Sequence, residues 1–314
     1  MAPVIAVVAM GEMGAGLGGL MVQKKARVRT TLGGRSPESF ERAQKAGVEV
    51  VDDERALLSG ADFFLSIVPP GVAKTTAAHY APILRELDRR PVYVDCNAVS
   101  PQTVREIGSI VASSNTEFVD ACLLGVAPGP GRPMPRMFLS GAVATKVQPL
   151  ADYGLMMEVL TGDIGEASAL KCAYAALGKG LTAIAAWSIL GAQQYGVADI
   201  FTREVAQYQS QLAATLTKLL PDMFPKANRW IAEMQEIGSF LEAVPGGASG
   251  FASIARFYQE VANLAGNHGA DIGGLARTIE EFLNAPGIQS LVKPKGGGSQ
   301  SHVGLFSDEA RGTP

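Results

Sequence analysis

Short apolar runs recur through the first half of the chain and predict buried β-strands. Two of them, "APVIAVVA" and "FFLSIV", are continuous rather than alternating, which is typical of strands covered on both faces. Helical patterns lie between the earlier runs, at residues 39–46 and 75–87. Because strands alternate with helices, we expect an α/β fold with a doubly wound parallel sheet. The strands are expected at residues 4–9, 28–32, 63–68, 92–95, 117–120 and 136–139.

The pattern changes near Gly162. Residues 167–195 contain no proline and no alternation, and Lys171 and Lys179 are their only charged residues. At about 1.5 Å per residue this stretch predicts a helix of roughly 43 Å. A helix that is apolar on nearly all sides must be buried, so we place it at the centre of a second, all-helical domain. Further helices are expected at residues 203–219, 227–242, 251–263 and 275–283.

Composition and charge narrow the classes of partner. The chain has 314 residues, with 27 lysines and arginines against 30 aspartates and glutamates, so its formal net charge is −3. Without a basic stripe to neutralise phosphates, nucleic acid is not an expected partner. The longest later apolar run, residues 180–192, has 13 residues and is too short to span a bilayer, so no membrane association is expected. Three scattered cysteines suggest neither a disulfide framework nor a zinc site, and we expect reduced thiols in a cytoplasmic protein.

The stretch "VVAMGEMG" places Ala9, Gly11 and Gly14 at the three positions of the phosphate-binding fingerprint G-x-G-x-x-G. The second glycine lets the backbone approach a pyrophosphate, and the third lets the helix pack on the strand. The first is replaced by Ala9, which adds only a methyl group at the turn. The loop opens a helix rich in glycine and alanine, whose N-terminus would face the anion. The alternative is a glycine-rich turn that holds no ligand.

The loop after the next predicted strand indicates which dinucleotide is bound. An acidic residue about 20 positions after the fingerprint would hold the ribose 2′-OH of NAD. Arg35 stands there instead, followed by Ser36. An arginine beside a hydroxyl suits the 2′-phosphate of NADP, so NADP(H) is the expected cofactor. The alternatives are a solvated surface arginine and a serine that caps a helix beginning at Pro37.

Two later strand ends carry further candidate contacts. "FLSIVPPG" places Val68 and Pro69 at a carboxyl end of the sheet, where dinucleotides bind. "YVDCNAVSP" places Asn97 at the next such end, before a helix start at Ser100 and Pro101. The Asn97 amide can both donate and accept hydrogen bonds, which suits a carboxamide or a substrate oxygen. A simple turn asparagine is the alternative.

Lys171 is the strongest candidate for a catalytic group. It lies about one turn into the long apolar helix, where a lysine is costly without a partner or a task. Tyr174 and Gly178 share its face of the helix. A buried lysine can exchange a proton with a substrate oxygen, whereas one at the helix edge would extend its ammonium to solvent. Lys179 lies about 80° further round the helix and is a weaker candidate.

Together these segments resemble the β-hydroxyacid dehydrogenase superfamily, the relatives of 3-hydroxyisobutyrate and 6-phosphogluconate dehydrogenases. The resemblance covers about residues 4–265, with the motifs "AMGEMG", "GRS", "VDCNAVSP", "VDACLLG" and "GDIGEASALKCAY" in the family's order. A little-characterised branch of the family is most similar, because the chain also carries "VPPG", "ALKCAYAALGKGLTA" and "ANRWIAEMQEIGSFLEAV".

The resemblance implies a Rossmann-type domain, a helical domain through which two copies pair as a homodimer, and Lys171 as the general acid/base. It implies substrate contacts at Asn97, Leu124, Gly125, Val126 and Tyr174. It implies cofactor contacts at Gly11, Glu12, Met13, Gly14, Arg35, Ser36, Val68, Pro69 and Asn97.

Two departures from the family bear on the substrate. The family's Ser-Gly-Gly, which holds a substrate carboxylate, is replaced by Leu124, Gly125 and Val126, and its asparagine after the lysine is replaced by Tyr174. Both changes remove polar contacts, which argues against a small 2- or 3-hydroxy acid. Arg132 and Arg136 follow in the next loop, either as anion ligands or as ordinary surface arginines.

We therefore expect a cytoplasmic NADP-dependent oxidoreductase that transfers a hydride between the nicotinamide and a carbonyl or hydroxyl carbon of a small substrate. An imine reductase and a non-catalytic NADP-binding sensor are the alternatives. The expected domains are a dinucleotide-binding domain at residues 1–164, a helical substrate and dimerisation domain at 165–292, and a flexible tail at 293–314.

Overall fold

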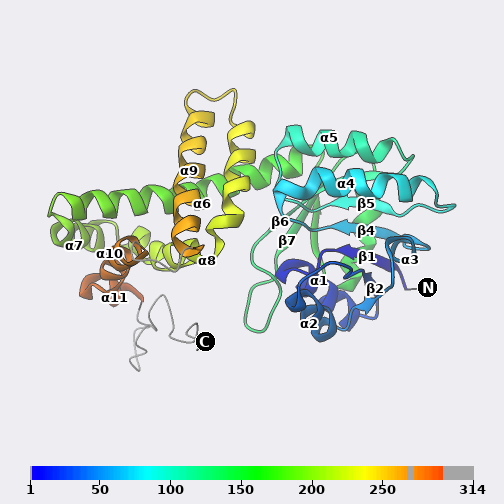
Figure 1. Cartoon of the computed structure of the whole chain (residues 1–314), viewed down its shortest axis with the longest axis horizontal. Helices are drawn as coiled ribbons and strands as arrows, with labels where there is room; N and C mark the ends of the chain where they lie inside the picture. Colours follow the sequence, from blue (N-terminus) through cyan, green and yellow to red (C-terminus); the bar gives the residue numbers. More distant parts are fainter. Residues whose placement is uncertain (1, 267–271, 293–314) are drawn as a thin grey trace. The chain divides into compact units, whose positions relative to one another are not determined.

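The chain forms two compact units in a computed structural model that describes residues 2–266 and 272–292 (Figure 1). The tail expected at residues 293–314 lies outside the described residues. The first unit joins the described residues up to 174 to a later segment, 235–248.

The second unit contains residues 175–234 and the described residues from 249 onward. The division between the units falls inside two long helices, after Tyr174 and after Met234, whereas the sequence pattern placed the change of domain at residue 165. The later segment, 235–248, begins inside α8 and has no counterpart in the predicted division.

The first unit is built on a sheet with the strand order β3-β2-β1-β4-β5-β6-β7-β8. The pairs from β3 to β6 are parallel, as predicted, but β7 runs antiparallel to β6, so the sheet is predominantly rather than wholly parallel. Its strands are β1 Val4–Val8, β2 Arg27–Thr30, β3 Glu49–Val50, β4 Phe63–Ser66, β5 Val92–Asp95, β6 Phe118–Leu124, β7 Arg136–Ser140 and β8 Met156–Val159.

Helices cover both faces of this sheet, with α4 and α5 over one face and α1 and α2 over the other (Figure 1). Alternate residues of β1 enter two separate apolar clusters: Ile5 and Val7 pack with α1, and Ala6 and Val8 pack on the side of α4. Burial on both faces is the reason why this strand has a continuous apolar sequence. The helices of this unit are α1 Glu12–Gln23, α2 Pro37–Ala46, α3 Glu54–Leu58, α4 Pro70–Arg85, α5 Pro101–Ala112 and the 3₁₀ segment η1 Ala144–Tyr153.

The sequence pattern missed the strands β3 and β8. Both residues of β3 are exposed, and β8 alternates exposed and half-buried residues, so neither has the apolar run by which buried strands are recognised.

The helical part contains α6 Glu166–Gln194, α7 Ala198–Tyr208, α8 Ser210–Phe240, α9 Gly247–Gly266, α10 Ile272–Asn284 and α11 Pro286–Val292. Helices were expected at residues 203–219 and 227–242, and both stretches are mainly helical, but the boundaries were wrong: α7 ends at Tyr208, and α8 then runs from Ser210 through Pro221 and Pro225. Its buried face repeats at helical spacing across both prolines, and this packing holds the helix together despite the missing N–H donors. The buried residues of that face are Leu216, Leu220, Met223, Ala227, Trp230 and Met234.

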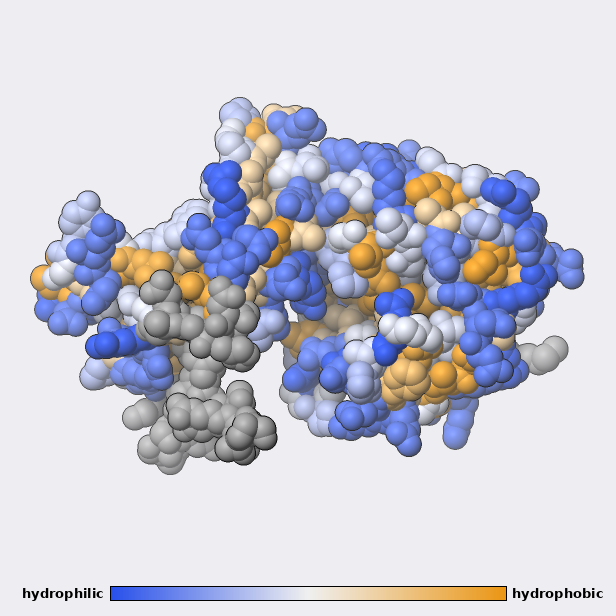
Figure 2. Space-filling view, viewed as in Figure 1, coloured by the Kyte–Doolittle hydropathy of each residue, from blue (hydrophilic) through white to orange (hydrophobic). Residues whose placement is uncertain are grey.

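The long apolar helix α6 was expected to be buried on every side, and this was wrong for the single chain. Ala183, Ala186 and Ile189 are buried, but Leu177 is 75% exposed and Ile184 is 54% exposed. Figure 2 shows hydrophobic residues on the visible surface of the helices at the left. By length and composition α6 could cross a membrane, and it is the one such helix among the described residues, although core helices of soluble proteins meet the same test.

Candidate dinucleotide and catalytic site

The loop between β1 and α1 has the geometry that a dinucleotide requires. Gly11 occupies the N-cap position of α1, so no side chain covers the backbone N–H groups of the first turn. A Cβ atom on Gly11 would meet nothing within 4 Å, which leaves room for a pyrophosphate. A Cβ atom on Gly14 would lie 2.0 Å from the carbonyl oxygen of Ala9, so only glycine allows α1 to pack this closely on the strand end. These residues fit a bound dinucleotide.

Two other segments contact this loop. Arg42, on α2, donates from Nη1 to the carbonyl oxygen of Met10 at 3.4 Å, and sequence reasoning did not find it. A Cβ atom on Gly16 would lie 2.9 Å from Pro128, so the connection from β6 to β7 packs against α1. Glu12 is exposed in the first turn of α1, where its charge stabilises the helix N-terminus, and Met13 is half-buried beside it.

Arg35 and Ser36 lie in the exposed connection between β2 and α2. Ser36 is the N-cap of α2 with Pro37 in the first turn, as the alternative interpretation required, but its hydroxyl makes no capping hydrogen bond. That hydroxyl lies 3.4 Å from the hydroxyl of Ser39 and interacts with the carboxylate of Glu38, whose pKa it lowers. Both expected contacts with a 2′-phosphate therefore lie at the surface of one turn.

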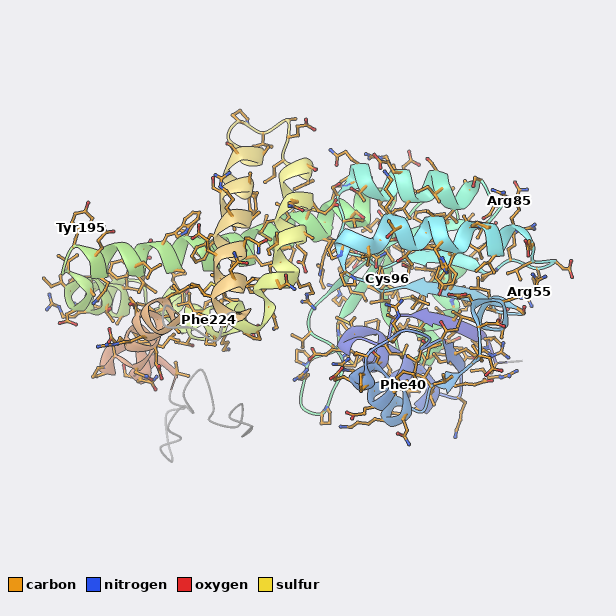
Figure 3. All side chains as sticks on the ribbon, in the orientation of Figure 1. Phe40, Arg55, Arg85, Cys96, Tyr195 and Phe224 are labelled. Carbon is orange, nitrogen blue, oxygen red and sulfur yellow. The ribbon has the colours of Figure 1, made fainter. Side chains whose placement is uncertain are left out.

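Asn97 lies just beyond the end of β5, directly after Cys96, which Figure 3 labels. It is 2% exposed, and its amide is largely occupied within the protein. Oδ1 accepts from the backbone N–H of Val68 at 2.7 Å, while Nδ2 donates to Ser66 Oγ at 3.1 Å and to Asp95 Oδ2 at 2.9 Å. Both amide hydrogens are thus used, so in this structure Asn97 joins two strand ends that were expected to contact the cofactor.

A row of buried polar side chains crosses the sheet beside Asn97. Ser66, Asp95, Asp120 and Ser140 stand at matching register on β4, β5, β6 and β7, and each is completely buried. Burial raises the pKa of Asp95 to about 7; the Asn97 hydrogen bonds lower it in part, and the neighbouring Asp120 charge raises it further. The row begins at Ser66, beside the end of β1, and ends at Ser140, which contacts the first turn of α6.

Asp120 holds the N-terminus of α6. Its Oδ2 accepts from the backbone N–H groups of Gly165 at 2.8 Å and Ser168 at 3.2 Å, and from the Ser140 hydroxyl at 2.9 Å. Ser140 in turn accepts from the N–H of Ala167 at 3.1 Å. A carboxylate at this point satisfies N–H groups that have no partner within the helix and opposes the helix dipole.

Lys171 lies one turn further along α6, half-buried, and its Nζ donates to the carbonyl oxygen of Leu123 at 2.7 Å. Strand β6 thus holds α6 at two points, through Asp120 and through Leu123. The other expected substrate residues follow along this strand and helix. Leu124 is half-buried, Gly125 has a φ of +122°, Val126 is 48% exposed and Tyr174 is 61% exposed.

The weaker candidates have structural partners. The Lys179 ammonium pairs with the Glu233 carboxylate and lies 5.4 Å from the centroid of the Trp230 ring. Arg136 pairs with Glu158 at 2.6 Å. No cluster of His, Cys, Asp and Glu that could hold a metal ion occurs in residues 2–266 and 272–292. The three cysteines are buried and form no disulfide.

Comparison with known proteins identifies the class to which these units belong. Residues 4–141 match the NAD binding domain of 6-phosphogluconate dehydrogenase, and residues 192–261 match a domain of unknown function, DUF1932. The first unit is therefore an NAD-binding domain. The chain thus combines a segment that matches that NAD-binding domain with a segment that matches DUF1932.

Individual proteins resemble this chain over most of its length. An uncharacterised 28.5 kDa protein of Methanothermus fervidus is 28% identical over 69% of this chain and 82% of its own. The conserved protein MTH1747, of unknown function and similar in structure to 3-hydroxyacid dehydrogenases, is 27% identical over 84% of this chain and 99% of its own, with a TM-score of 0.62. The 3-hydroxyisobutyrate dehydrogenase of Mycobacterium tuberculosis has the same fold, with a TM-score of 0.66 and 18% identity over 89% of this chain and 99% of its own.

Proposed function

We propose that this protein is an NADP(H)-dependent oxidoreductase that acts on a carbonyl or hydroxyl carbon of a small molecule, with Lys171 as its general acid/base. The observation that carries the proposal is the position of Lys171, whose Nζ is bound to the Leu123 carbonyl on a strand of the dinucleotide-binding sheet. The nicotinamide of a bound dinucleotide would supply or accept the hydride. The chain must then bind the substrate, orient it and move one proton at its oxygen.

Lys171 suits the proton transfer. A lysine ammonium can donate a proton to the oxygen of a carbonyl as the hydride reaches the carbon, and the neutral amine can take the proton back in the reverse direction. Asp120 and Leu123 fix the helix and the ammonium to the same strand, which limits movement of Lys171 relative to the sheet.

The cofactor preference rests on Arg35. A guanidinium binds a phosphate through charge-assisted hydrogen bonds, and Arg35 stands where NAD-binding proteins of this fold carry an acid. Arg35 and Ser36 are exposed in the same turn, which suits them to a 2′-phosphate at the protein surface.

Reduction of an imine is the second candidate. It is favoured by the side chains beside Lys171, since Leu124 and Val126 are apolar and Tyr174 presents a phenol that is 61% exposed. The two chemistries share the hydride step and differ in whether the substrate heteroatom that receives a proton is oxygen or nitrogen.

Oxidation of NADPH in the presence of a panel of neutral and acidic carbonyl compounds and cyclic imines tests the proposal directly. We expect consumption of NADPH with at least one carbonyl compound and a strong loss of that rate in Lys171→Met. A protein that binds neither NADPH nor NADH, or that reduces none of the compounds, would contradict the assignment as an enzyme.

We also propose that the protein is a cytoplasmic homodimer. The apolar side chains that α6 exposes in the single chain support this, because a patch of that kind is usually covered by another protein surface.

A further inference from the structure

The last turns of α8 return to the first unit and contribute a carboxylate to it. Residues 235–248 belong to that unit although the preceding part of α8 does not. Glu236 Oε2 accepts from the backbone N–H of Ser100 at 2.7 Å and from the hydroxyl of Thr103 at 2.8 Å. Ser100 is the N-cap of α5, so a residue 136 positions away in sequence completes the cap of this helix.

Two hydrogen bonds connect Glu236 with the residue next to Lys171, one between Glu236 and Ser100 and one between Val99 and Cys172. Cys172, the residue after Lys171, donates from Sγ to the carbonyl oxygen of Val99 at 3.4 Å, and Ser100 is the next residue after Val99. Burial raises the pKa of the Cys172 thiol to about 12, and the charge of Glu236 is the second cause of that shift. The charges of the Glu236 carboxylate and of the Lys171 ammonium both act on this thiol, Glu236 raising its pKa and Lys171 lowering it, so both groups lie within electrostatic range of Cys172.

The start of α5 is a position that attracts anions. It follows the carboxyl end of β5, and the N–H groups and dipole of a helix N-terminus favour negative charge there. Here the chain's own carboxylate occupies two donors of this position, the Ser100 N–H and the Thr103 hydroxyl. A substrate carboxylate at this helix start would find those donors occupied and meet a fixed negative charge.

The residues that follow Leu123 on the chain, which are expected to bind the substrate, provide no replacement. Leu124 and Val126 are apolar, and Gly125 between them offers only its backbone. Lys171 itself must address the reacting oxygen if it is the general acid, so the same ammonium cannot also neutralise a carboxylate on the substrate.

We propose that Glu236 determines the substrate class of this site: it selects carbonyl compounds or imines whose group next to the reacting carbon is neutral or cationic, and it disfavours those that carry a carboxylate there. The inference rests on the proposed function and deepens it. At an effective dielectric of about 20, repulsion between any two carboxylates on the order of 10 Å apart corresponds to about a tenfold difference in affinity or rate.

The experiment compares a 2-keto acid with its methyl ester as substrates for NADPH oxidation. The parent protein is expected to reduce the ester with a kcat/KM about tenfold above that for the acid. Glu236→Gln keeps an oxygen for Ser100 and Thr103 but removes the charge, so the ratio should fall towards one. Glu242→Gln is the matched control, because it removes an exposed charge from the same segment and makes no cap; its ratio should equal that of the parent.

Thr103→Val provides a second variant that separates charge from structure. It removes one hydrogen bond to Glu236 and leaves the carboxylate, so it should lower the melting temperature without changing the ratio of ester to acid. If the parent prefers the acid, or if Glu236→Gln leaves the ratio unchanged, the inference is wrong.

Failure of the proposed function gives a different result. A parent that reduces neither this pair nor any other compound of the panel refutes the oxidoreductase proposal, and calorimetric titration of the acid and the ester into the unliganded protein then still tests Glu236. Tighter binding of the ester by the parent, lost in Glu236→Gln, supports the inference; equal binding, or tighter binding of the acid, overturns it.

Discussion

Ser168 donates two hydrogen bonds to Asp120, one from its backbone N–H at 3.2 Å and one from its hydroxyl at 2.8 Å. The two residues are 48 positions apart, on β6 and in the first turn of α6. This pair fixes the start of the helix that carries Lys171 to the strand whose Leu123 carbonyl accepts from that lysine. Asp120 therefore acts on the candidate catalytic group as a positioning residue.

Asp120→Asn tests this position. The asparagine cannot accept at both side-chain atoms, so at least one donor among Ser140, Gly165 and Ser168 loses its acceptor. We expect a loss of about 1–3 kcal/mol in the free energy of unfolding. Under conditions where the variant is fully folded, the rate of hydride transfer should also fall while the affinity for NADPH stays near that of the parent. Asp88→Asn, at an exposed position outside the row, serves as the control. An Asp120→Asn variant with parental stability and rate would contradict the role.

The raised pKa of Asp95 implies that the free energy of unfolding depends on pH. Its pKa is about 7 in the folded protein against an ordinary value of 3.8, so between these pH values the folded chain holds a proton that the unfolded chain has lost. Its contribution to the free energy of unfolding therefore falls as the pH rises from about 4 to about 7, by up to about 4 kcal/mol, and is constant above.

Asp95→Asn should remove this contribution. Denaturant unfolding of parent and variant at several pH values gives the difference, in which the titration of other carboxylates cancels. The variant should gain stability relative to the parent as the pH approaches 7. A difference that does not change between pH 4 and pH 8 would show that burial of Asp95 does not shift its titration.

The sequence predicted the parts of the fold that local patterns encode. The strands β1, β4 and β5 were recognised because they are continuous apolar runs, and α6 because it has 29 residues without a proline. The loop before α1 was recognised by the spacing of its glycines. That spacing has a steric reason, because a Cβ atom placed on Gly14 would lie 2.0 Å from the carbonyl oxygen of Ala9.

The remaining features of the candidate site depend on pairs of residues that are distant in sequence. Glu236 meets Ser100 across 136 positions and Arg42 meets Met10 across 32, and no local pattern marks either contact. The polar row had a weak signal, since Asp95 ends one predicted strand and Ser66 interrupts the apolar residues of another. Its continuation to Asp120 could not be predicted without the register of the sheet.

Arg35→Ala tests the choice of cofactor. Loss of a charge-assisted contact with the 2′-phosphate should weaken NADPH binding roughly ten- to a hundredfold and leave NADH binding nearly unchanged. Fluorescence titration of both reduced cofactors gives the two affinities. Glu38→Gln is the matched control in the same exposed turn, and removal of its negative charge should if anything tighten NADPH binding. Equal affinities of the parent for NADPH and NADH would reject the NADP assignment.

The exposed apolar face of α6 predicts a homodimer. Leu177 and Ile184 are both more than half exposed in the single chain, although the helix around them is apolar. Leu177→Glu combined with Ile184→Glu should convert dimers into monomers, since two charges would be buried without partners. Phe40→Glu places the same charge at a similarly exposed apolar residue of the first unit and should leave the assembly intact. Light scattering of the parent at micromolar concentration measures the oligomeric state. A monomer under these conditions would contradict the predicted homodimer.

Lys171→Met decides the role of the candidate acid/base. Methionine retains most of the apolar stem and deletes the titrating group, so the variant should fold and bind NADPH while single-turnover hydride transfer to a carbonyl falls by about 10²–10⁴-fold. Lys74→Met, which breaks only an exposed ion pair with Glu106, should leave the rate unchanged. A rate for Lys171→Met within a few fold of the parent would mean that Lys171 serves the structure through Leu123, and Tyr174 would become the better candidate for the proton donor.

Such a result would also favour imine reduction, because a substrate that is already an iminium ion accepts a hydride without proton delivery to an oxygen. Measuring the variant against both a carbonyl compound and a cyclic imine therefore separates the two chemistries as well as the two roles of the lysine.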